Sequence, residues 1–283
     1  MRGCIQASIT NGRWHGALRR AAAALAAASL VLLVAGCMAG GDAAGASFKP
    51  VHPGVLAVAT ALVPAPGFWE GPPGNGGFEA QLATALAHRL GLNRVRIVQV
   101  PFGQIVGGHL NGADIAMSQL TPTSERERSL DFSTAYLTAP PGVLAREGVE
   151  ARDLKSLQAL RWVTSRTSTL TPIVMNEVRP DTTPLSVEDR SAALAVLRSG
   201  RADALLLDLP VALGLAREDP GQFTVLGQLP GNEGLAAALP NGSPNLEIVD
   251  TELRALQADG TIDRLRARWL GSEAAVPLIR TEG

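Results

Sequence analysis

Hydroxyl and amide side chains and a guanidinium group are concentrated in one short stretch, residues 114–126. It opens with the apolar run 115–117, which is typical of the end of a buried strand. Three polar residues follow within four positions: Ser118, Gln119 and Thr121. Pro122 favours a helix start, and Thr121 or Thr123 is suited to its N-cap. The pattern predicts a strand end, hydroxyl groups and a helix N-terminus in one place.

Arg126 falls about one turn into this expected helix. Helix N-termini attract anions, and a guanidinium binds a carboxylate through two parallel hydrogen bonds. The stretch therefore predicts a carboxylate pocket at the carboxyl end of a strand, where open α/β sheets bind their ligands. The alternative is a surface turn in which Arg126 pairs with Glu125 or Glu127.

The same order of groups recurs after an expected strand at residues 160–165. Arg166, Ser168 and Thr169 follow it, and a helix is expected toward Val178. Ser168 and Thr169 repeat the hydroxyls at a helix start. Arg166 is an additional cation, which favours a ligand with an acidic or amide side chain if it faces that ligand. The alternative for Arg166 is a surface arginine.

Asp208 is a carboxylate at the end of the apolar run 204–207. Burying a carboxylate is costly unless it is paired, so Asp208 is expected to have a partner. The alternative is an N-cap for the helix that starts at Pro210. Both roles can coexist.

Aromatic side chains follow two of the expected strands. Phe68 and Trp69 come after the strand 54–60, in a segment too rich in proline for regular structure. Phe102 comes after the strand 94–100. Aromatic rings beyond a strand end can form the wall of a ligand site or can belong to the core, and both interpretations stay open.

Apolar patterns predict strands alternating with helices around these groups. The expected strands are 54–60, 94–100, 160–165, 204–207, 223–229 and 235–239. The expected helices are 77–91, 154–160, 169–178, 186–198, one from 210, 243–258 and a last one ending near 271. Such alternation predicts an α/β fold.

The N-terminal residues have the composition of an export signal. Four arginines precede an uncharged apolar run at residues 21–34 that is short for a membrane span. The following Val-Ala-Gly-Cys37 resembles a bacterial lipobox, so residues 1–36 are expected to be a signal peptide. Residues 37–53 are expected to be a lipidated Cys37 and a flexible linker. The alternatives are an ordinary signal peptide and an uncleaved anchor.

Composition limits the other classes of function. The chain has 283 residues and a formal net charge of −1, which allows one or two domains and argues against nucleic acid as a partner. Removal of residues 1–36 leaves 21 basic and 26 acidic residues, a formal charge of −5. Cys37 is then the one cysteine left, so no internal disulfide or cysteine-based metal site is expected. No cofactor or metal is expected.

Several motifs together resemble the bacterial extracellular solute-binding proteins of family 3, which are receptors of ABC importers for amino acids and similar solutes. The motif Thr-x-Thr-x-x-Arg stands at residues 121–126, and Asp-Phe-Ser-x-x-Tyr stands at 131–136. Gly-Phe-Asp-x-x-Leu-Ala stands at 77–83, with Glu79 for Asp. Gly-Arg-x-Asp-Ala-x-x-x-Asp stands at 200–208. The resemblance extends from about residue 54 to 271.

The resemblance implies an α/β fold of the two-lobed, type II periplasmic-binding-protein kind. The ligand cleft lies between lobes that are joined by two crossovers and that close by a hinge motion. The implied boundaries are 54–140 and 232–271 for lobe 1 and 141–231 for lobe 2. Residues 272–283 are expected to form a disordered tail.

The resemblance also implies three groups of ligand contacts. The α-carboxylate is bound by Arg126, Thr121, Thr169 and Ser168. The α-ammonium is bound by Asp208, Ser118 and Gln119. The side chain is walled by Phe102 and by Phe68 or Trp69. Ala61 stands where the family commonly has an Asp, and Thr167 stands in place of the usual Gly.

The implied function is an amino-acid receptor that is lipid-anchored on the extracytoplasmic face, monomeric and without catalytic residues, and that delivers its ligand to an ABC permease. One alternative is a lipoprotein that senses an amino acid for a membrane signalling partner. Another is a cyclohexadienyl-dehydratase-like enzyme on the same fold. That enzyme needs a general acid or base, for which the candidates are Asp208, Glu70 and His109.

Overall fold

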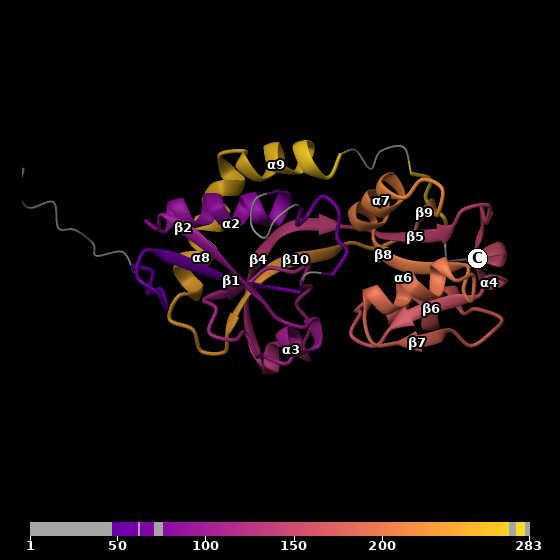
Figure 1. Cartoon of the computed structure of the whole chain (residues 1–283), viewed down its shortest axis with the longest axis horizontal. Helices are drawn as coiled ribbons and strands as arrows, with labels where there is room; N and C mark the ends of the chain where they lie inside the picture. Colours follow the sequence, from indigo (N-terminus) through magenta and orange to yellow (C-terminus); the bar gives the residue numbers. More distant parts are fainter. Residues whose placement is uncertain (1–46, 62, 71–75, 272–275, 281–283) are drawn as a thin grey trace, which may run out of the picture. The chain divides into compact units, whose positions relative to one another are not determined.

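The computed structural model describes residues 47–61, 63–70, 76–271 and 276–280. Its strands form two five-stranded sheets, in the orders β2-β1-β3-β10-β4 and β7-β6-β8-β5-β9 (Figure 1). We call the part built on the first sheet lobe 1 and the part built on the second sheet lobe 2. Both sheets are mixed and flanked by helices, so the predicted two-lobed α/β fold is confirmed.

Lobe 1 is built on the parallel strands β1 (Val55–Thr60), β2 (Arg94–Gln99) and β3 (Ile115–Ala116). The later strand β10 (Glu233–Pro240) pairs antiparallel with β3 and with β4 (Leu130–Ala139). Its helices are α2 (Phe78–Arg89), α3 (Phe102–Val106), α8 (Leu246–Ala258) and α9 (Thr261–Trp269). The leucine spacing predicted for α2 buries Leu82 and Leu86 in the core of this lobe.

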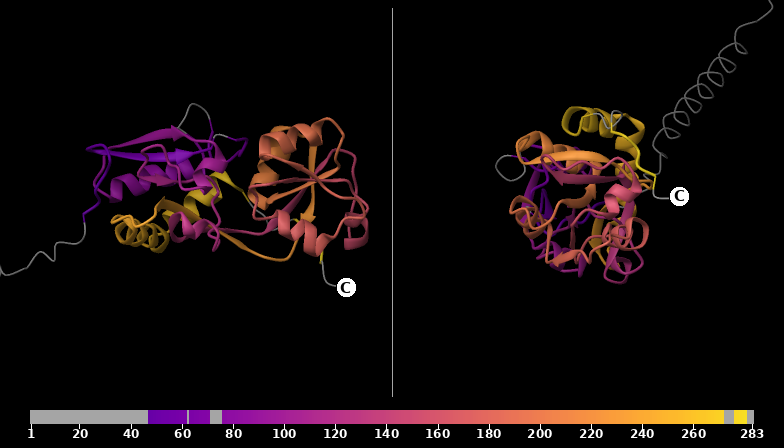
Figure 2. Two further views of the ribbon diagram at one scale, coloured as in Figure 1. Left: turned by 90° about the horizontal axis from the view of Figure 1, so that it is seen from below. Right: turned by 90° about the vertical axis from the view of Figure 1, so that its right-hand side faces the viewer.

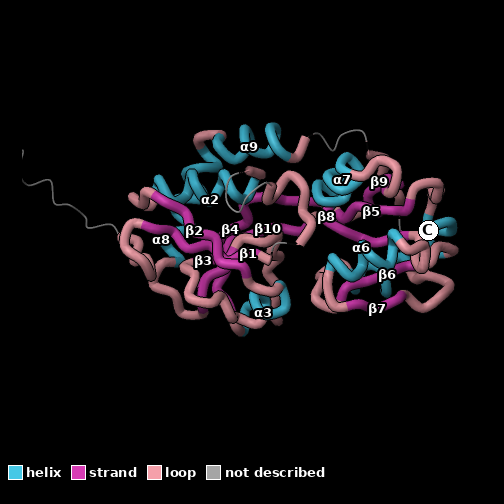
Figure 3. Tube along the Cα trace, in the orientation of Figure 1, coloured by secondary structure: helices cyan, strands magenta, loops and turns pink. Residues whose placement is uncertain are grey.

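Lobe 2 repeats this plan with β6 (Trp162–Ser165) parallel to β7 (Leu185–Val187) and β8 (Ala204–Asp208). Strand β5 (Pro141–Arg146) pairs antiparallel with β8 and with β9 (Phe223–Gln228). Its helices are α4 (Leu154–Gln158), α5 (Thr171–Ile173), the π-helical turn Val174–Val178, α6 (Arg190–Arg198) and α7 (Leu209–Glu218). Figures 2 and 3 show the strands of each lobe with helices packed beside them. Among the described residues, no helix has the length and hydropathy needed to cross a bilayer.

The chain passes between the two sheets at Pro140, which joins β4 to β5, and again between β9 and β10. A third passage follows α9, where residues 276–280 lie along β9. The N–H of Gln228 donates to Pro277 O, and the N–H of Ile279 donates to Gln228 O, both at 2.8 Å. Ile279 is 3 % exposed and packs in the core of lobe 2. The expected disordered tail is therefore wrong for residues 276–280, because an apolar side chain near the terminus is buried against the edge strand.

The structure also differs from the expected linker at residues 37–53 and from the expected helix at 186–198. Within the expected flexible linker, Phe48 is buried in lobe 1, and the N–H of Lys49 donates to the side chain of Asn245 at 2.9 Å. The helix expected over 186–198 begins later, because Ser186 belongs to the short strand β7, which pairs with β6. Three residues are too few for a strand pattern to emerge from the sequence.

The C-terminal contact predicts a clear difference between two neighbouring residues. Ile279→Ala should lower the free energy of unfolding by ~2–5 kcal/mol, because it truncates a buried side chain in a packed core. Leu278 is 55 % exposed, so Leu278→Ala should change it by less than ~0.5 kcal/mol. Denaturant unfolding of both variants measures the difference. Equal small effects would contradict the anchoring of this segment on lobe 2.

Candidate ligand-binding site

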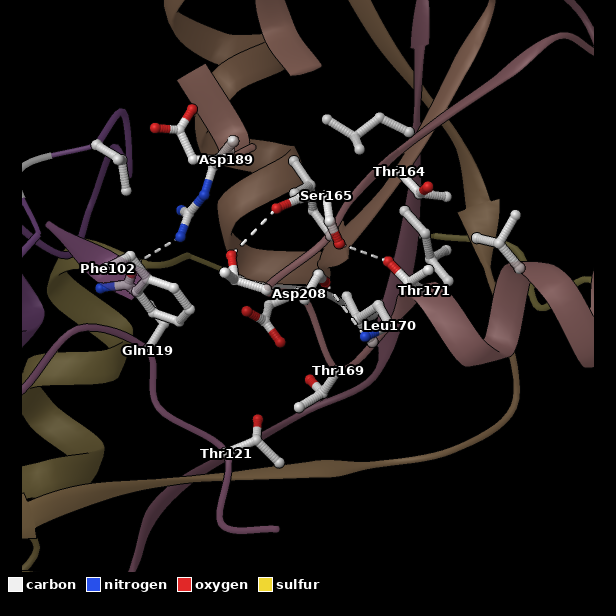
Figure 4. A pocket seen from close by; sticks show the side chains of 18 of the residues that line it. Phe102, Gln119, Thr121, Thr164, Ser165, Thr169, Leu170, Thr171, Asp189 and Asp208 are labelled. Atoms are coloured by element: carbon white, nitrogen blue, oxygen red, sulfur yellow. Dashed lines mark hydrogen bonds between the residues drawn. The ribbon is translucent and has the colours of Figure 1, made fainter. Parts of the chain in front are cut away.

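The polar segments that follow β3, β6 and β8 meet at one cavity, which is lined from both lobes (Figure 4). The lining from lobe 1 includes Phe102, Gln119, Thr121 and Arg126. The lining from lobe 2 includes residues 163–165 and 167–171, Asp189, Arg190 and Asp208. Most of the predicted ligand contacts are therefore brought together, although they lie far apart in the sequence.

Arg126 is held in a fixed orientation by main-chain carbonyls of both lobes. Its Nη1 donates to Thr121 O at 2.7 Å, and its Nη2 donates to Thr167 O at 2.9 Å. The guanidinium carbon lies 5.6 Å from the centre of the Phe102 ring. Burial lowers the pKa of Arg126, and the negative charges of Glu233 and Asp208 oppose this. The side chain is thus an oriented, partly desolvated cation at the boundary of the two lobes.

The helix that was expected to contain Arg126 begins later and is shorter than predicted. Arg126 begins a 3₁₀ turn, Arg126–Arg128, and residues 122–125 are not helical. Thr123 does act near this start, since its Oγ1 accepts from the N–H of Arg126 at 3.2 Å. A single turn is enough to direct Arg126 into the cavity.

A buried carboxylate, Glu79, supports the lobe 1 wall. Its Oε1 accepts from the N–H of Gln119 at 2.8 Å and from the hydroxyl of Tyr136. Its Oε2 accepts from Nε2 of Gln119 and from Nε1 of Trp69, both at 2.6 Å. Burial raises the pKa of Glu79, and these four donors oppose the increase. The resemblance motif around Gly77 had included Glu79 without giving it a role. Glu79 lies behind the cavity and fixes the residue that faces it.

Gln119 is that residue, and its backbone has the left-handed conformation, with φ of 50°. This conformation is unfavourable for residues with a Cβ, and such strain is found at functional sites. The two hydrogen bonds to Glu79 hold Gln119 in place and turn its Oε1 away from Glu79. That oxygen accepts from Nη2 of Arg190 at 3.1 Å.

Arg190 is a cavity residue that sequence reasoning missed. It is the first residue of α6, directly after Asp189, whose side chain accepts from the N–H of Ala192 and caps the helix. Besides Gln119, Arg190 donates from Nη1 to Pro64 O at 3.2 Å. Burial lowers its pKa, and the negative charge of Asp208 is the largest opposing influence. The only sequence signal was the helix-start pattern Glu188-Asp189 immediately before it.

Asp208 ends β8 and lies half-buried in the cavity wall. Burial raises its pKa to about 7; Arg190 opposes the increase, and the negative charges of Glu233 and Glu79 add to it. Asp208 occupies the position before α7, yet its side chain makes no capping hydrogen bond. Its carboxylate is therefore not used as a side-chain cap.

Thr121 and Thr169 lie next to each other, one from each lobe (Figure 4). Both hydroxyls donate to Oε2 of Glu233, at 2.7 Å from Thr121 and 2.5 Å from Thr169. Glu233 is the first residue of β10, directly after the second passage between the sheets. The boundary implied between residues 231 and 232 lies beside Glu233, but the sequence assigned no role to this carboxylate.

The predicted aromatic wall is wrong for two of its three members. Phe68 is fully buried and packs edge-to-face on Phe78, with ring centres 5.9 Å apart. Trp69 is half-buried and directs its Nε1 to Glu79. Neither lines the cavity, because the core of lobe 1 takes up both rings. Phe102 lines it as predicted.

The polar residues predicted to contact the ligand also include some that line the cavity and some that do not. Arg166 does not line the cavity: its side chain is 57 % exposed and pairs with Glu188 at the surface, so the surface alternative holds. Ser118 is 1 % exposed and accepts from the N–H of Ala61 at 3.1 Å, which ties the ends of β1 and β3 together outside the lining. Ser168 lines the cavity, and its Oγ accepts from the N–H of Leu170.

Three residues were candidates for the general acid or base of a dehydratase-like enzyme, and of these three Asp208 alone lines the cavity. Glu70 accepts from the N–H of Gly67 at 2.8 Å, and His109 is exposed. Among the described residues, no group of three His, Cys, Asp or Glu side chains is arranged to hold a metal ion. The cavity therefore presents cations, carboxylates and hydroxyls suited to binding a small charged molecule.

Comparisons with known proteins agree with this chemistry. Residues 63–272 match the bacterial extracellular solute-binding proteins, family 3. The L-cystine-binding protein TcyJ of Escherichia coli (strain K12) is 29 % identical over 206 residues, covering 70 % of this chain and 75 % of that protein. The ABC transporter glutamine-binding protein GlnH of Bacillus subtilis (strain 168) is 24 % identical, covering 57 % and 59 %. The structure of an ancestral arginine-binding protein bound to glutamine is 26 % identical with a TM-score of 0.68, covering 78 % and 100 %.

The raised pKa of Asp208 predicts how stability changes with pH in the unliganded protein. Between about pH 4 and 7 the folded state holds a proton on Asp208 that the unfolded state, with a pKa near 3.8, has released. This carboxyl group therefore makes the free energy of unfolding fall as pH rises through that range, by up to ~4 kcal/mol. Asp208→Asn should remove this contribution, so the variant gains stability relative to wild type as pH rises.

The measurement is denaturant unfolding at several pH values from 5 to 8, with Asp263→Asn as the control. Asp263 is an exposed carboxylate on α9 and does not line the cavity. If Asp208→Asn and wild type keep a constant difference across this range, Asp208 does not titrate as described.

Proposed function

The chain belongs to the bacterial extracellular solute-binding proteins of family 3, and we propose that it is a receptor that binds one free amino acid and delivers it to an ABC importer. One observation carries this proposal: a fixed guanidinium, Arg126, and a half-buried carboxylate, Asp208, contribute to one cavity from opposite lobes. An amino acid is a zwitterion whose two charges are complementary to such a pair.

In this proposal Arg126 binds the α-carboxylate. Its guanidinium is planar, permanently charged and already oriented by Thr121 O and Thr167 O, so little side-chain entropy is lost on binding. Ser168, which follows the strand end of β6, supplies a further hydroxyl for the carboxylate. Phe102 packs against Arg126 and against the ligand.

Asp208 binds the α-ammonium in the same proposal. An ammonium beside it replaces solvent as the partner of a carboxylate whose ionised form is disfavoured by burial. Gln119, which is fixed by Glu79, lines the same cavity from lobe 1.

The ligand side chain is proposed to extend toward Arg190 and Gln119. The sequence had suggested Arg166 as the cation that faces the ligand side chain. We assign this role to Arg190, because Arg190 lines the cavity and is desolvated. An acidic or amide side chain offers oxygen atoms to this guanidinium. The proposed ligand class is therefore an amino acid with an acidic or amide side chain.

Delivery requires a cleft that opens and closes. We propose that residues 54–140 and 232–271 move as one body relative to 141–231, with the two strand passages as the hinge. The contacts of Arg126 with Thr167 and of Arg190 with Gln119 support this, because they join the lobes and must break on opening. The signal peptide 1–36 and the lipid on Cys37 lie outside the described residues, and we propose that they tether the receptor to the outer face of the membrane.

The amino-acid assignment is tested by calorimetric titration of the domain from Met38 to Gly283 with each standard L-amino acid, after unfolding and refolding to remove bound ligand. One amino acid should bind tightly. Arg126→Ala should weaken it at least ~100-fold, because a desolvated carboxylate then lacks its partner, at a cost of ~3–5 kcal/mol.

Arg128→Ala is the matched control, since Arg128 lies in the same turn and is exposed. It should retain wild-type affinity. Wild-type affinity in Arg126→Ala, with circular dichroism confirming that both variants are folded, would refute the carboxylate assignment.

A second comparison tests the ligand class. Arg190→Ala should weaken an acidic or amide ligand at least ~10-fold relative to alanine or serine as ligand, because it removes the cation that faces the side chain. Arg166→Ala, which removes a surface cation, should leave affinity within about twofold. If Arg166→Ala lowers the affinity more than Arg190→Ala does, the ligand side chain is bound near Arg166 and the assignment to Arg190 is wrong.

A further inference from the structure

We propose that Glu233 fixes the hydroxyls of Thr121 and Thr169 as hydrogen-bond acceptors toward the cavity, so that this part of the site selects a ligand with a free ammonium group. The inference rests on the proposed function and adds to it a residue that sets specificity. It also reassigns the two threonine hydroxyls, which the sequence had suggested for the ligand carboxylate.

The geometry places Glu233 behind the two threonines. Thr121 and Thr169 line the cavity, whereas Glu233 is not part of its lining. One carboxylate oxygen, Oε2, receives both hydroxyls, at 2.7 and 2.5 Å. Because Thr121 belongs to lobe 1 and Thr169 to lobe 2, this single oxygen connects the lobes at the start of β10.

The direction of these hydrogen bonds follows from the donor inventory. A hydroxyl carries one proton and two lone pairs, and an ionised carboxylate only accepts. The protons of Thr121 and Thr169 therefore both point to Glu233. The lone pairs that remain on the two hydroxyls are available to the cavity, which makes them partners for N–H groups and poor partners for a carboxylate.

The charges around these hydroxyls agree with this polarity. Asp208 also lines this part of the cavity, and the charge of Glu233 is one of the causes that raise its pKa. A ligand ammonium next to Asp208, Thr121 and Thr169 meets three acceptors and relieves the repulsion between the two carboxylates. A ligand carboxylate in the same position meets acceptors and negative charge, so it is directed to Arg126.

The consequence is a defined ligand requirement. A primary ammonium provides three N–H donors for Asp208 and the two hydroxyls. A 2-hydroxy acid with the same side chain provides one O–H donor and no charge. The site should therefore prefer an amino acid over its 2-hydroxy analogue, and Glu233 should be responsible for much of that preference.

The test is Glu233→Gln, which keeps the shape of the side chain and adds N–H donors. The amide can donate to one hydroxyl, which then turns its own proton toward the cavity. Calorimetry is performed with the L-amino acid that binds wild type most tightly and with the L-2-hydroxy acid of the same side chain. We expect the amino acid to bind at least tenfold more weakly and the preference over the hydroxy acid to shrink at least tenfold.

Glu188→Gln is the matched control, because Glu188 pairs with Arg166 at the surface. It should leave both affinities unchanged. Tighter binding of the amino acid by Glu233→Gln would overturn the proposal and make Glu233 a competitor of the ligand carboxylate. An equal loss for both ligands would also overturn it, since that outcome indicates a structural role.

A ligand-free measurement separates this inference from the proposed function. Carboxyl ¹³C NMR of the unliganded protein follows the titration of Asp208 in wild type and in Glu233→Gln. Loss of the Glu233 charge should lower the pKa of Asp208. An unchanged pKa would overturn the proposed coupling of Glu233 to this subsite. If the coupling is present and wild type binds no amino acid, the receptor proposal fails while the arrangement of Glu233 stands.

Discussion

The buried carboxylate of Glu79 is the interaction on which the lobe 1 side of the site depends. It receives hydrogen bonds from Trp69, Tyr136 and twice from Gln119, so it joins the start of α2 to the end of β3 and to β4. A carboxylate without access to water destabilises the fold unless such donors surround it. The arrangement leaves little freedom for Gln119, because the hydrogen bond from its own N–H to Glu79 holds its backbone in the left-handed conformation. A strained cavity residue is thus supported by a carboxylate that does not itself line the cavity.

The contacts between the lobes follow a second constraint, the satisfaction of desolvated cations. Arg126 reaches Thr167 O, and Arg190 reaches Gln119 and Pro64 O, so each cation has an acceptor on the opposite lobe. Carbonyl and amide oxygens satisfy hydrogen bonds without cancelling the charge. The electrostatic attraction for a ligand carboxylate or side-chain oxygen is therefore retained while the lobes are in contact. Under the proposed function, a ligand carboxylate adds a charged acceptor to these neutral ones, and this additional interaction favours the closed arrangement of the lobes.

The sequence predicted those parts of the fold and the site that depend on local patterns. The segments around Arg126, Thr169 and Asp208 were found because each follows an apolar run, and strand ends meet where parallel sheets bind ligands. Residues whose role is decided by distant packing were not found. Phe68 and Trp69 could have faced a ligand or the core, and only the position of Phe78 and Glu79 decides for the core. Ile279 was missed for the same reason, since its partners on β9 lie about fifty residues away.

Arg166 and Arg190 show why a charge in the sequence does not identify a binding residue. Arg166 directly follows β6, and Arg190 begins α6 shortly after β7, so both follow short strands of lobe 2. Arg166 pairs with Glu188 in solvent, where water and salt screen the pair and its charge acts weakly at a distance. Burial lowers the pKa of Arg190, which means that its charge is poorly solvated and interacts strongly with any nearby anion. Arg190 is the first residue of α6, whose start is fixed by the Asp189 cap, and from this position its side chain lines the cavity, whereas that of Arg166 does not.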